Sequence, residues 1–503
     1  MRQALTKSMS NIGKGVQLGV VKILDHPLWI SSLSVLLLFL VFNPGYMTND
    51  SLSHYSLAGR LDQLSLYHPP AMPYFFSIGR LFSDDQTSIL LIQIIIFISG
   101  VYFLASSLFG RKAYVSLTIA VISIYPALFP IIGTLWKSVW MTAFLLWAGG
   151  FVLHHAQRPR WWTLTGAVLF LFAALFSRFD AIAPVGVMLF MLAVTSMGPA
   201  LWRRGIVRPR ATLIASFIIA LGAVLVVGAI VRAGNEAMTV RNLHPSHVFL
   251  YQDLMSVSIQ VGEVRVPRYI ADENPGLTVE QLQAAYAEHT CNAFLRIINN
   301  RSGDAPYRLR RPSNDAEAKQ FAQAWRRAVL DHPMAYAQGR LGIVAPLLGL
   351  TDQPHFPYYV GVAENSLGLT IEQTPVQALA ETYAHFWAYD VKVFHRPWLY
   401  IMVLLAVFAA GWRRTPQGTG VQPAFLLLPA AGISHILTIA SITCASDFRF
   451  AFLLCTFSVI GVIAALVNRF APHAFLDVDD SLVYLHLRPA KQPPASTFTG
   501  EGP

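Results

Sequence analysis

The stretch SILLIQIIIFISGVYFLASSLF, residues 88–109, contains no charged side chain. A membrane-spanning helix needs about 20 mainly apolar residues, so this stretch predicts a transmembrane helix. Across all 503 residues, 54% are hydrophobic and only 13% are charged, whereas soluble domains carry about 25% charged residues. One water-facing core stops growing near about 250–300 residues and cannot bury such an apolar excess. The sequence therefore predicts an all-α polytopic membrane protein.

Nine other stretches have a similar composition, although one of them, residues 163–176, is short. The ten predicted transmembrane helices cover residues 28–44, 88–109, 113–132, 138–153, 163–176, 181–197, 211–231, 397–412, 423–442 and 451–467. They divide the chain into a cytoplasmic N-terminus (1–27), seven helices (28–231) with a first outer loop (45–87), an extracytoplasmic domain (232–396), three helices (397–468) and a cytoplasmic tail (469–503). The Pro-, Ser- and Gly-rich end of the tail is typical of disorder.

The predicted extracytoplasmic domain is the one sizeable polar region of the chain, and its pattern is mainly α-helical. Residues 278–298 and 315–330 have helical spacing of apolar side chains, and residues 299–314 read as a loop. Residues 335–350 are apolar but short, so we expect them to lie in the membrane interface or to re-enter the membrane.

Basic residues alternate between the two sides of the predicted membrane. The loops on one side hold Arg111, Lys112, Arg158, Arg160, Arg203, Arg204, Arg208, Arg210, Arg413, Arg414 and Arg469, and the short loops on the other hold Arg60, Arg80, Lys137, Arg178 and Arg449. This positive-inside bias predicts that both termini lie in the cytoplasm of a bacterial inner membrane. It also assigns the net charge of +10 to topology rather than to nucleic-acid binding.

The chain has three cysteines, Cys291, Cys444 and Cys455, and none of them forms a CxxC motif. This count supports neither a disulfide framework nor a zinc site. A pair between Cys291 and Cys444 is open if both lie outside the membrane.

An acidic residue, Asp50, follows the end of the first predicted helix by a few residues. An ionised carboxylate at the membrane boundary is costly unless it is partnered or functional. Residues 51–64 have the apolar spacing of an amphipathic surface helix, and capping of that helix by Asp50 or Ser51 is the structural alternative to a functional role.

The last outer loop places Asp447 and Arg449 two residues apart at the entrance of the final helix. Arginine is suited to bidentate contact with a phosphate. Other cations are predicted on the same side of the membrane: Arg60, Lys137 and Arg178. Each alone is more often structural, but together they indicate a site for an anionic headgroup.

These parts, in this order, resemble the C-type (GT-C) superfamily of polyprenyl-phosphate-sugar glycosyltransferases, which includes protein O-mannosyltransferases and lipid A aminoarabinose transferases. The resemblance rests on an acidic residue in the first outer loop followed by an aromatic helix, a His-Pro-Pro at the end of that loop, a Lys after the third helix, and an Asp-x-Arg-Phe segment opening the last helix. The matching residues are Asp50 with Tyr55, His68-Pro69-Pro70, Lys137, and Asp447-Phe448-Arg449-Phe450. In this family the acidic residue of the first outer loop is the proposed general base, and basic residues near the cavity bind the carrier phosphate.

The resemblance implies an inverting glycosyltransferase with a GT-C-like fold. Asp50 would accept the acceptor's proton, and Lys137 and Arg449 would bind the carrier phosphate. From the residues themselves, His54 and His68 are candidate substitutes for the base, and Arg178, on the same side of the membrane, is a further candidate for the phosphate site. Asn49 and Ser51 flank Asp50, so a divalent cation, if one binds there, would find a single carboxylate where it prefers several oxygens. Aromatic residues of the extracytoplasmic domain suit sugar stacking and a protein core equally: Trp325, Tyr358, Tyr359 and Trp387.

Other functions use the same architecture. A flippase or transporter of lipid-linked sugars would carry ionisable residues along its helices, whereas the charged candidates here gather at one surface. A ligase or polymerase of surface polysaccharide would share the large outer loop and the lipid-linked donor. A catalytically inactive scaffold is the fourth reading. The sugar, the carrier length, the acceptor and the oligomeric state do not follow from the sequence.

Overall fold

The computed structural model describes residues 24–65, 69–203, 209–240, 247–287, 290, 291, 295, 298, 307–352, 355–413 and 423–475. Within these ranges every regular element is a helix, and β pairing is limited to isolated bridges. The all-helical class predicted from the sequence is therefore confirmed.

Six helices of the described part are long and apolar enough to cross a membrane. They are α5 (Thr87–Leu108), α8 (Lys137–Gln157), α10 (Ile182–Arg203), α11 (Pro209–Ala237), α20 (Ala424–Ile442) and α21 (Phe452–Phe470). Four shorter apolar helices are α2 (Pro27–Phe42), α6 (Lys112–Ile124), α9 (Trp161–Ser177) and α19 (Pro397–Arg413). Each predicted span overlaps one of these ten helices. Length and composition alone support six spans.

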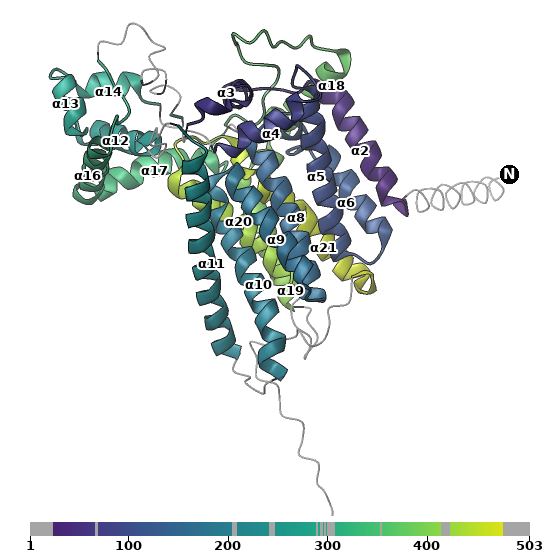
Figure 1. Ribbon diagram of the computed structural model, residues 1–503. Helices are drawn as coiled ribbons and strands as arrows, with labels where there is room; N and C mark the ends of the chain where they lie inside the picture. Colours follow the sequence, from purple (N-terminus) through teal and green to yellow (C-terminus); the bar gives the residue numbers. More distant parts are fainter. Residues whose placement is uncertain are drawn as a thin grey trace, which may run out of the picture.

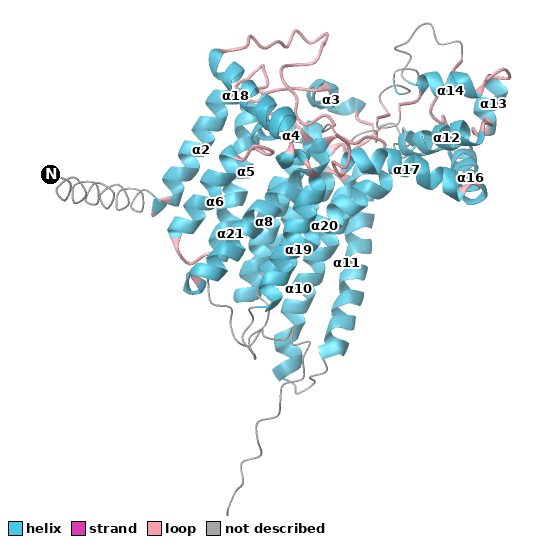
Figure 2. Ribbon diagram, turned by 180° about the vertical axis from the view of Figure 1, so that it is seen from behind, coloured by secondary structure: helices cyan, strands magenta, loops and turns pink. Residues whose placement is uncertain are grey.

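The apolar helices stand side by side in one bundle (Figures 1 and 2). Small residues allow close packing at its centre: an ideal Cβ built on Gly100 of α5 would lie 3.0 Å from the Ala143 carbonyl oxygen of α8. Such small-residue contacts are typical of membrane helices, since lipid supplies no hydrophobic force between them. Helix α11 stands at the edge of the bundle and exposes Phe217, Ile218 and Leu225, as expected of a lipid-facing helix.

The predicted span over residues 113–132 is wrong in one respect, because it is not one continuous helix. Helix α6 ends at Ile124, and a separate short helix, α7, covers Phe129–Ile132. Pro126 explains the break: proline disfavours the helical conformation in the residue before it, and Tyr125 is extended (φ −64°, ψ 127°).

Both long connecting segments lie at the same end of the bundle, which we call the loop end (Figure 1). The first contains α3 (Asn49–Ala58), the 3₁₀ helix η1 (Leu61–Gln63) and α4 (Ala71–Arg80). The amphipathic helix predicted over residues 51–64 is thus shorter and interrupted, since Gly59 follows α3 and glycine is a poor helix former. Thr48 is the residue at the N-cap position, so the capping role considered for Asp50 or Ser51 is wrong; Asp50 stands in the first turn.

The second long segment, predicted as one domain, divides into two parts. The side domain (residues 247–347) contains α12 (His247–Val261), α13 (Arg268–Glu273), α14 (Val279–Ala285), α16 (Asp315–Asp331) and α17 (Pro333–Leu347), packed around a core of its own. The strap (residues 348–396) contains α18 (Pro375–His385) and two short helical turns, η3 (Phe386–Val391) and η4 (Val393–His395), and returns across the loop end. Of the helix predicted over 278–298, α14 covers the first part and ends at Ala285, Leu295 and Ile298 are again helical, and several residues between them lie outside the described ones. The helix predicted over 315–330 is confirmed.

Backbone and side-chain hydrogen bonds hold the strap against the bundle. The Met47 amide donates to the Gly361 carbonyl at 2.9 Å, and the Ala363 amide donates to the Met47 carbonyl at 2.8 Å. Farther along, the Gln377 side chain donates to the Asn43 carbonyl at 2.7 Å. The strap therefore completes the surface formed by the first loop.

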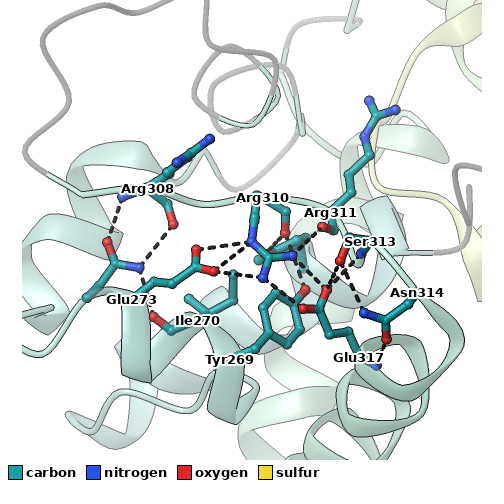
Figure 3. A network of polar contacts seen from close by, with 11 residues as sticks. Tyr269, Ile270, Glu273, Arg308, Arg310, Arg311, Ser313, Asn314 and Glu317 are labelled. Atoms are coloured by element: carbon teal, nitrogen blue, oxygen red, sulfur yellow. Dashed lines mark hydrogen bonds and ion pairs between the residues drawn. The ribbon is translucent and has the colours of Figure 1, made fainter.

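One arginine organises the polar face of the side domain (Figure 3). The Arg310 guanidinium donates to Glu273 of α13 (Nε–Oε1 2.8 Å) and to Glu317 of α16 (Nη1–Oε2 2.6 Å), and it lies 4.6 Å from the centre of the Tyr269 ring. Glu317 also accepts from the Ser313 amide at 2.7 Å. These bonds link α13, α16 and the loop that precedes α16.

The Arg310 network predicts acid sensitivity of the side domain. Hydrogen bonds from Arg310 lower the pKa of Glu317 from 4.5 to about 2. A carboxyl whose pKa is depressed by folding stabilises the fold fully above its ordinary pKa, and this contribution is lost as the pH falls through about 2. In Glu317→Gln, we expect the stability of the side domain to fall by about 2 kcal/mol at neutral pH. We also expect this variant to lose less stability than the wild type when the pH falls from 4.5 to 2. Hydrogen exchange of the full protein in nanodiscs, corrected for intrinsic pH effects, measures both.

The matched control is Arg268→Ala, which removes a solvent-exposed ion pair with Asp272 (Nε–Oδ2 3.6 Å). Exposed pairs contribute little, so this variant should exchange like the wild type. Identical pH profiles for the wild type and Glu317→Gln would contradict the prediction.

Candidate functional site

Charged side chains from four separate segments meet at the loop end of the bundle. We call this group the ion cluster: Asp50, Lys137, Arg178, Asp180, Asp447 and Arg449. They come from the first turn of α3, the first residue of α8, the 3₁₀ helix η2 (Phe179–Ala181) with its N-cap residue, and the α20–α21 loop with its 3₁₀ helix η5 (Phe448–Ala451). The gathering of cations predicted from the sequence thus holds for Lys137, Arg178 and Arg449.

Arg449 lies between two carboxylates. Its Nη1 is 3.1 Å from Oδ2 of Asp50, and its Nη2 is 2.9 Å from Oδ2 of Asp447. The guanidinium also lies 5.1 Å from the centre of the Trp136 ring, within the range of a cation–π contact. The Asp50 side chain is 32% exposed, against 15% for both Asp447 and Arg449. Asp50 is therefore the carboxylate of this trio that solvent and ligands reach most easily.

Arg178 belongs to a second, more deeply buried pair. It donates from Nε to Oδ1 of Asp180 at 2.8 Å, makes a second bond from Nη2 to Oδ2, and donates from Nη1 to the Ser138 hydroxyl at 2.9 Å. The two side chains are only 7% and 8% exposed. His435 of α20 is buried beside them, with Nε2 3.7 Å from Oδ2 of Asp180. Since this arginine is occupied by protein partners, it is suited to hold structure rather than to bind a ligand.

Both arginines lie close to the ring of Phe450. The guanidinium of Arg178 lies 5.1 Å from the centre of this ring, and that of Arg449 lies 5.4 Å from it. Lys137, half-buried at the start of α8, is close enough for its charge to interact with Asp50, Asp180 and both arginines. Three cations and three carboxylates therefore share one small region of the loop end.

Short-range bonds between the first loop and the start of α8 place Asp50 beside Lys137. The Tyr46 amide donates to the Gly133 carbonyl at 3.0 Å. The Trp136 indole donates to the Thr48 hydroxyl at 3.0 Å, and the Ser51 hydroxyl donates to the Leu135 carbonyl at 2.8 Å. These three contacts fix residues 46–51 along residues 133–136.

The other residues predicted for the site are placed as follows. His54 is buried in α3, with its ring centre 5.9 Å from that of Phe76. The Tyr55 hydroxyl donates to the Asp84 carbonyl, and its ring lies 4.8 Å from the Arg80 guanidinium, away from the ion cluster. Arg60 is exposed after α3. His68 lies outside the described residues.

The part of the strap nearest the cluster is aromatic. The Phe448 amide donates to the His355 carbonyl at 3.2 Å, and the Phe356 ring centre lies 6.0 Å from that of Trp136. Phe356 has φ 43°, a left-handed conformation that is costly for a bulky residue. Sequence reasoning missed both Phe356 and His435, although a histidine inside a predicted span is itself a signal of function.

The α20–α21 loop, which carries Asp447 and Arg449, is fastened to the side domain. Cys444 forms a disulfide with Cys291, the pairing that the sequence left open. Arg340 of α17 donates to the Thr443 carbonyl at 2.7 Å and pairs with Asp253 of α12 at 3.3 Å. Burial raises the pKa of the Asp253 carboxyl, an effect that the nearby Arg340 opposes.

Within the described residues, no three His, Cys, Asp or Glu side chains are grouped so as to hold a metal ion. No known protein family, curated protein or solved structure matches the chain.

The two carboxylates facing arginines should differ sharply in their effect on stability. Asp180→Asn leaves the buried Arg178 charge without its ion pair, and breaking such a pair costs about 3–5 kcal/mol. Asp50→Asn removes a partly exposed contact, so we expect a loss of at most about 1 kcal/mol. Thermal unfolding of the purified variants in detergent, followed by size-exclusion chromatography, measures the difference. Equal midpoints for the two variants would argue against a structural role for the Arg178–Asp180 pair.

Proposed function

We propose that this chain is a membrane glycosyltransferase that moves a sugar from a polyprenyl-phosphate donor to an acceptor at the loop end. The observation that carries the proposal is Arg449, held between Asp50 and Asp447, with Lys137 beside it at the start of a membrane helix. The site combines cations for a lipid phosphate with a partly exposed carboxylate for a hydroxyl acceptor. The resemblance to C-type glycosyltransferases in the order of these parts supports the same reaction.

Donor binding would use the two cations that lie beside the partly exposed Asp50. Arg449 and Lys137 would contact the phosphate oxygens, while the polyprenyl tail stays in the bilayer next to the helices. Arg178 would act as a positioning residue through Phe450, since Asp180 and Ser138 occupy its donors. This role differs from the phosphate contact that the sequence suggested for Arg178.

Donor binding would also release the general base. Asp50 contacts Arg449 through a 3.1 Å bond, and a phosphate that takes this guanidinium nitrogen would loosen the hold of Arg449 on the carboxylate. Asp50 then accepts the proton of the acceptor hydroxyl as its oxygen attacks the anomeric carbon. The bond between that carbon and the phosphate oxygen breaks, and its electron pair leaves with polyprenyl phosphate. Cations at the departing phosphate stabilise the developing negative charge.

The same proposal sets the location. We place the loop end outside a bacterial inner membrane and both termini in the cytoplasm, following the distribution of basic residues. The Cys291–Cys444 disulfide supports this orientation, because disulfides persist mainly in oxidising compartments. A divalent cation, if the reaction uses one, would bind at Asp50 together with donor oxygens.

The decisive test follows radiolabelled polyprenyl-phosphate sugars in isolated membranes that contain the wild type or Asp50→Asn. We expect label to move into lipid A or chloroform-insoluble fractions with the wild type. The expected loss with Asp50→Asn is about 10²–10⁴-fold, the usual contribution of a general base. Asp62→Asn is the matched control, because Asp62 is an exposed carboxylate of the same loop and should transfer normally.

Two other results would redirect the assignment. Transfer that survives in a normally expressed Asp50→Asn protein would keep the enzyme but remove Asp50 as its base. No transfer from any donor, accompanied by movement of labelled carrier between leaflets, would replace the transferase with a flippase.

A further inference from the structure

Helix α17 of the side domain has one packed face and one bare apolar face. The packed face is marked by Gly339, where an added Cβ would clash with Ser256 of α12, and by the buried Ile343 and Leu347. At about 100° per residue, Met334 and Leu341 lie about 140–200° around the helix from Gly339. Their side chains are 80% and 63% exposed. The face turned away from α12 is therefore apolar and uncovered within the described structure.

The position of α17 relative to the bundle is fixed by Arg340. Its guanidinium donates to the Thr443 and Ser441 carbonyls, at the C-terminal end of α20. Helix α20 is one of the six helices able to cross a membrane, so α17 lies at the level where a span ends. Both ribbon views show α17 beside the outer ends of the long helices, with α12 on its far side (Figures 1 and 2). The bare face, which is turned away from α12, consequently points in the direction in which the long helices extend from the loop end.

Helix α16 (Asp315–Asp331) is separated from α17 by a single residue, and it exposes both an apolar side chain and positive charge. Phe321 and Ala328 are buried against the rest of the domain. Leu330, which is 71% exposed, lies about 180° around the helix from Phe321, together with the exposed Arg326. Arg327 is exposed beside them. Apolar side chains next to arginines match the boundary between acyl chains and phosphate headgroups.

We propose that the side domain rests on the bilayer through a lipid face made of Arg326, Arg327, Leu330, Met334, Ala337 and Leu341. Its occupant is the leaflet at the loop end of the same membrane that holds the bundle. Leu330, Met334 and Leu341 enter the acyl boundary, and the two arginines contact lipid phosphates. A water-facing surface would leave these large apolar side chains hydrated, whereas the level of α17 places them where lipid is already present.

This docking would constrain the site as well. The side domain is bound to the α20–α21 loop through Arg340 and the Cys291–Cys444 disulfide, and that loop carries Arg449. A side domain held at a fixed depth therefore holds Arg449 at a fixed depth relative to lipid phosphates. The lipid face itself does not depend on which reaction the ion cluster performs.

The test measures lipid contact directly in the full-length protein. Met334→Cys and Leu341→Cys are labelled with bimane under non-reducing conditions; the native thiols do not interfere, because Cys455 is buried and the other two are paired. The protein is reconstituted in nanodiscs of phosphatidylglycerol and phosphatidylcholine, with or without doxyl-labelled lipid. We expect the doxyl lipid to quench both labels, and aqueous iodide to quench them weakly.

The control label is Asp272→Cys on α13, an exposed position of the same domain away from α17. It should respond to iodide and not to doxyl lipid. The proposal is overturned if the labels at positions 334 and 341 behave like the control. It is equally overturned if neither quencher reaches them, which would indicate burial by a second copy or another protein.

Discussion

The architecture of the loop end depends on one stretch of paired backbone. Tyr46 pairs with Thr134 at the entrance of α8, and the next residue, Met47, pairs with Val362 of the strap. Two consecutive residues thus join three segments that are far apart in sequence. Peptide groups near a bilayer lose water as a hydrogen-bond partner, so pairing of this kind is strongly favoured. It positions α3, and with α3 the carboxylate of Asp50, above the start of α8.

A second junction lies on the other side of the ion cluster. The α20–α21 loop is bonded to the side domain through Thr443 and Cys444, and it contributes Asp447 and Arg449 to the ion cluster. Only Ala445 and Ser446 separate Cys444 from Asp447, and η5 begins directly after Asp447. A shift of the side domain is therefore transmitted to Arg449 through a short, bonded segment rather than through a long flexible loop.

Local chemistry explains what the sequence could predict. Apolar runs indicate which residues are buried in lipid, so the positions of the helices could be predicted from composition. The site was indicated by cations on the side of the membrane where the positive-inside rule predicts few of them. The partner of Asp50 could not be found in this way, since Arg449 lies 399 residues away. The disulfide and the strap are likewise products of tertiary packing. Pro126 was a local signal of a helix break, but it lies in an apolar stretch that composition alone predicts as one continuous helix.

The disulfide also imposes an order on biogenesis. Cys291 and Cys444 are 153 residues apart, and the two apolar helices α19 and α20 lie between them. Cys291 leaves the ribosome first and must remain reduced, or be reshuffled by an oxidoreductase, until both helices have been inserted and the loop after them has been delivered. Fastening the side domain is thus among the last steps of assembly. A chain truncated before residue 444 would carry a side domain with its thiol unsatisfied, a mark by which quality control could recognise an unfinished molecule.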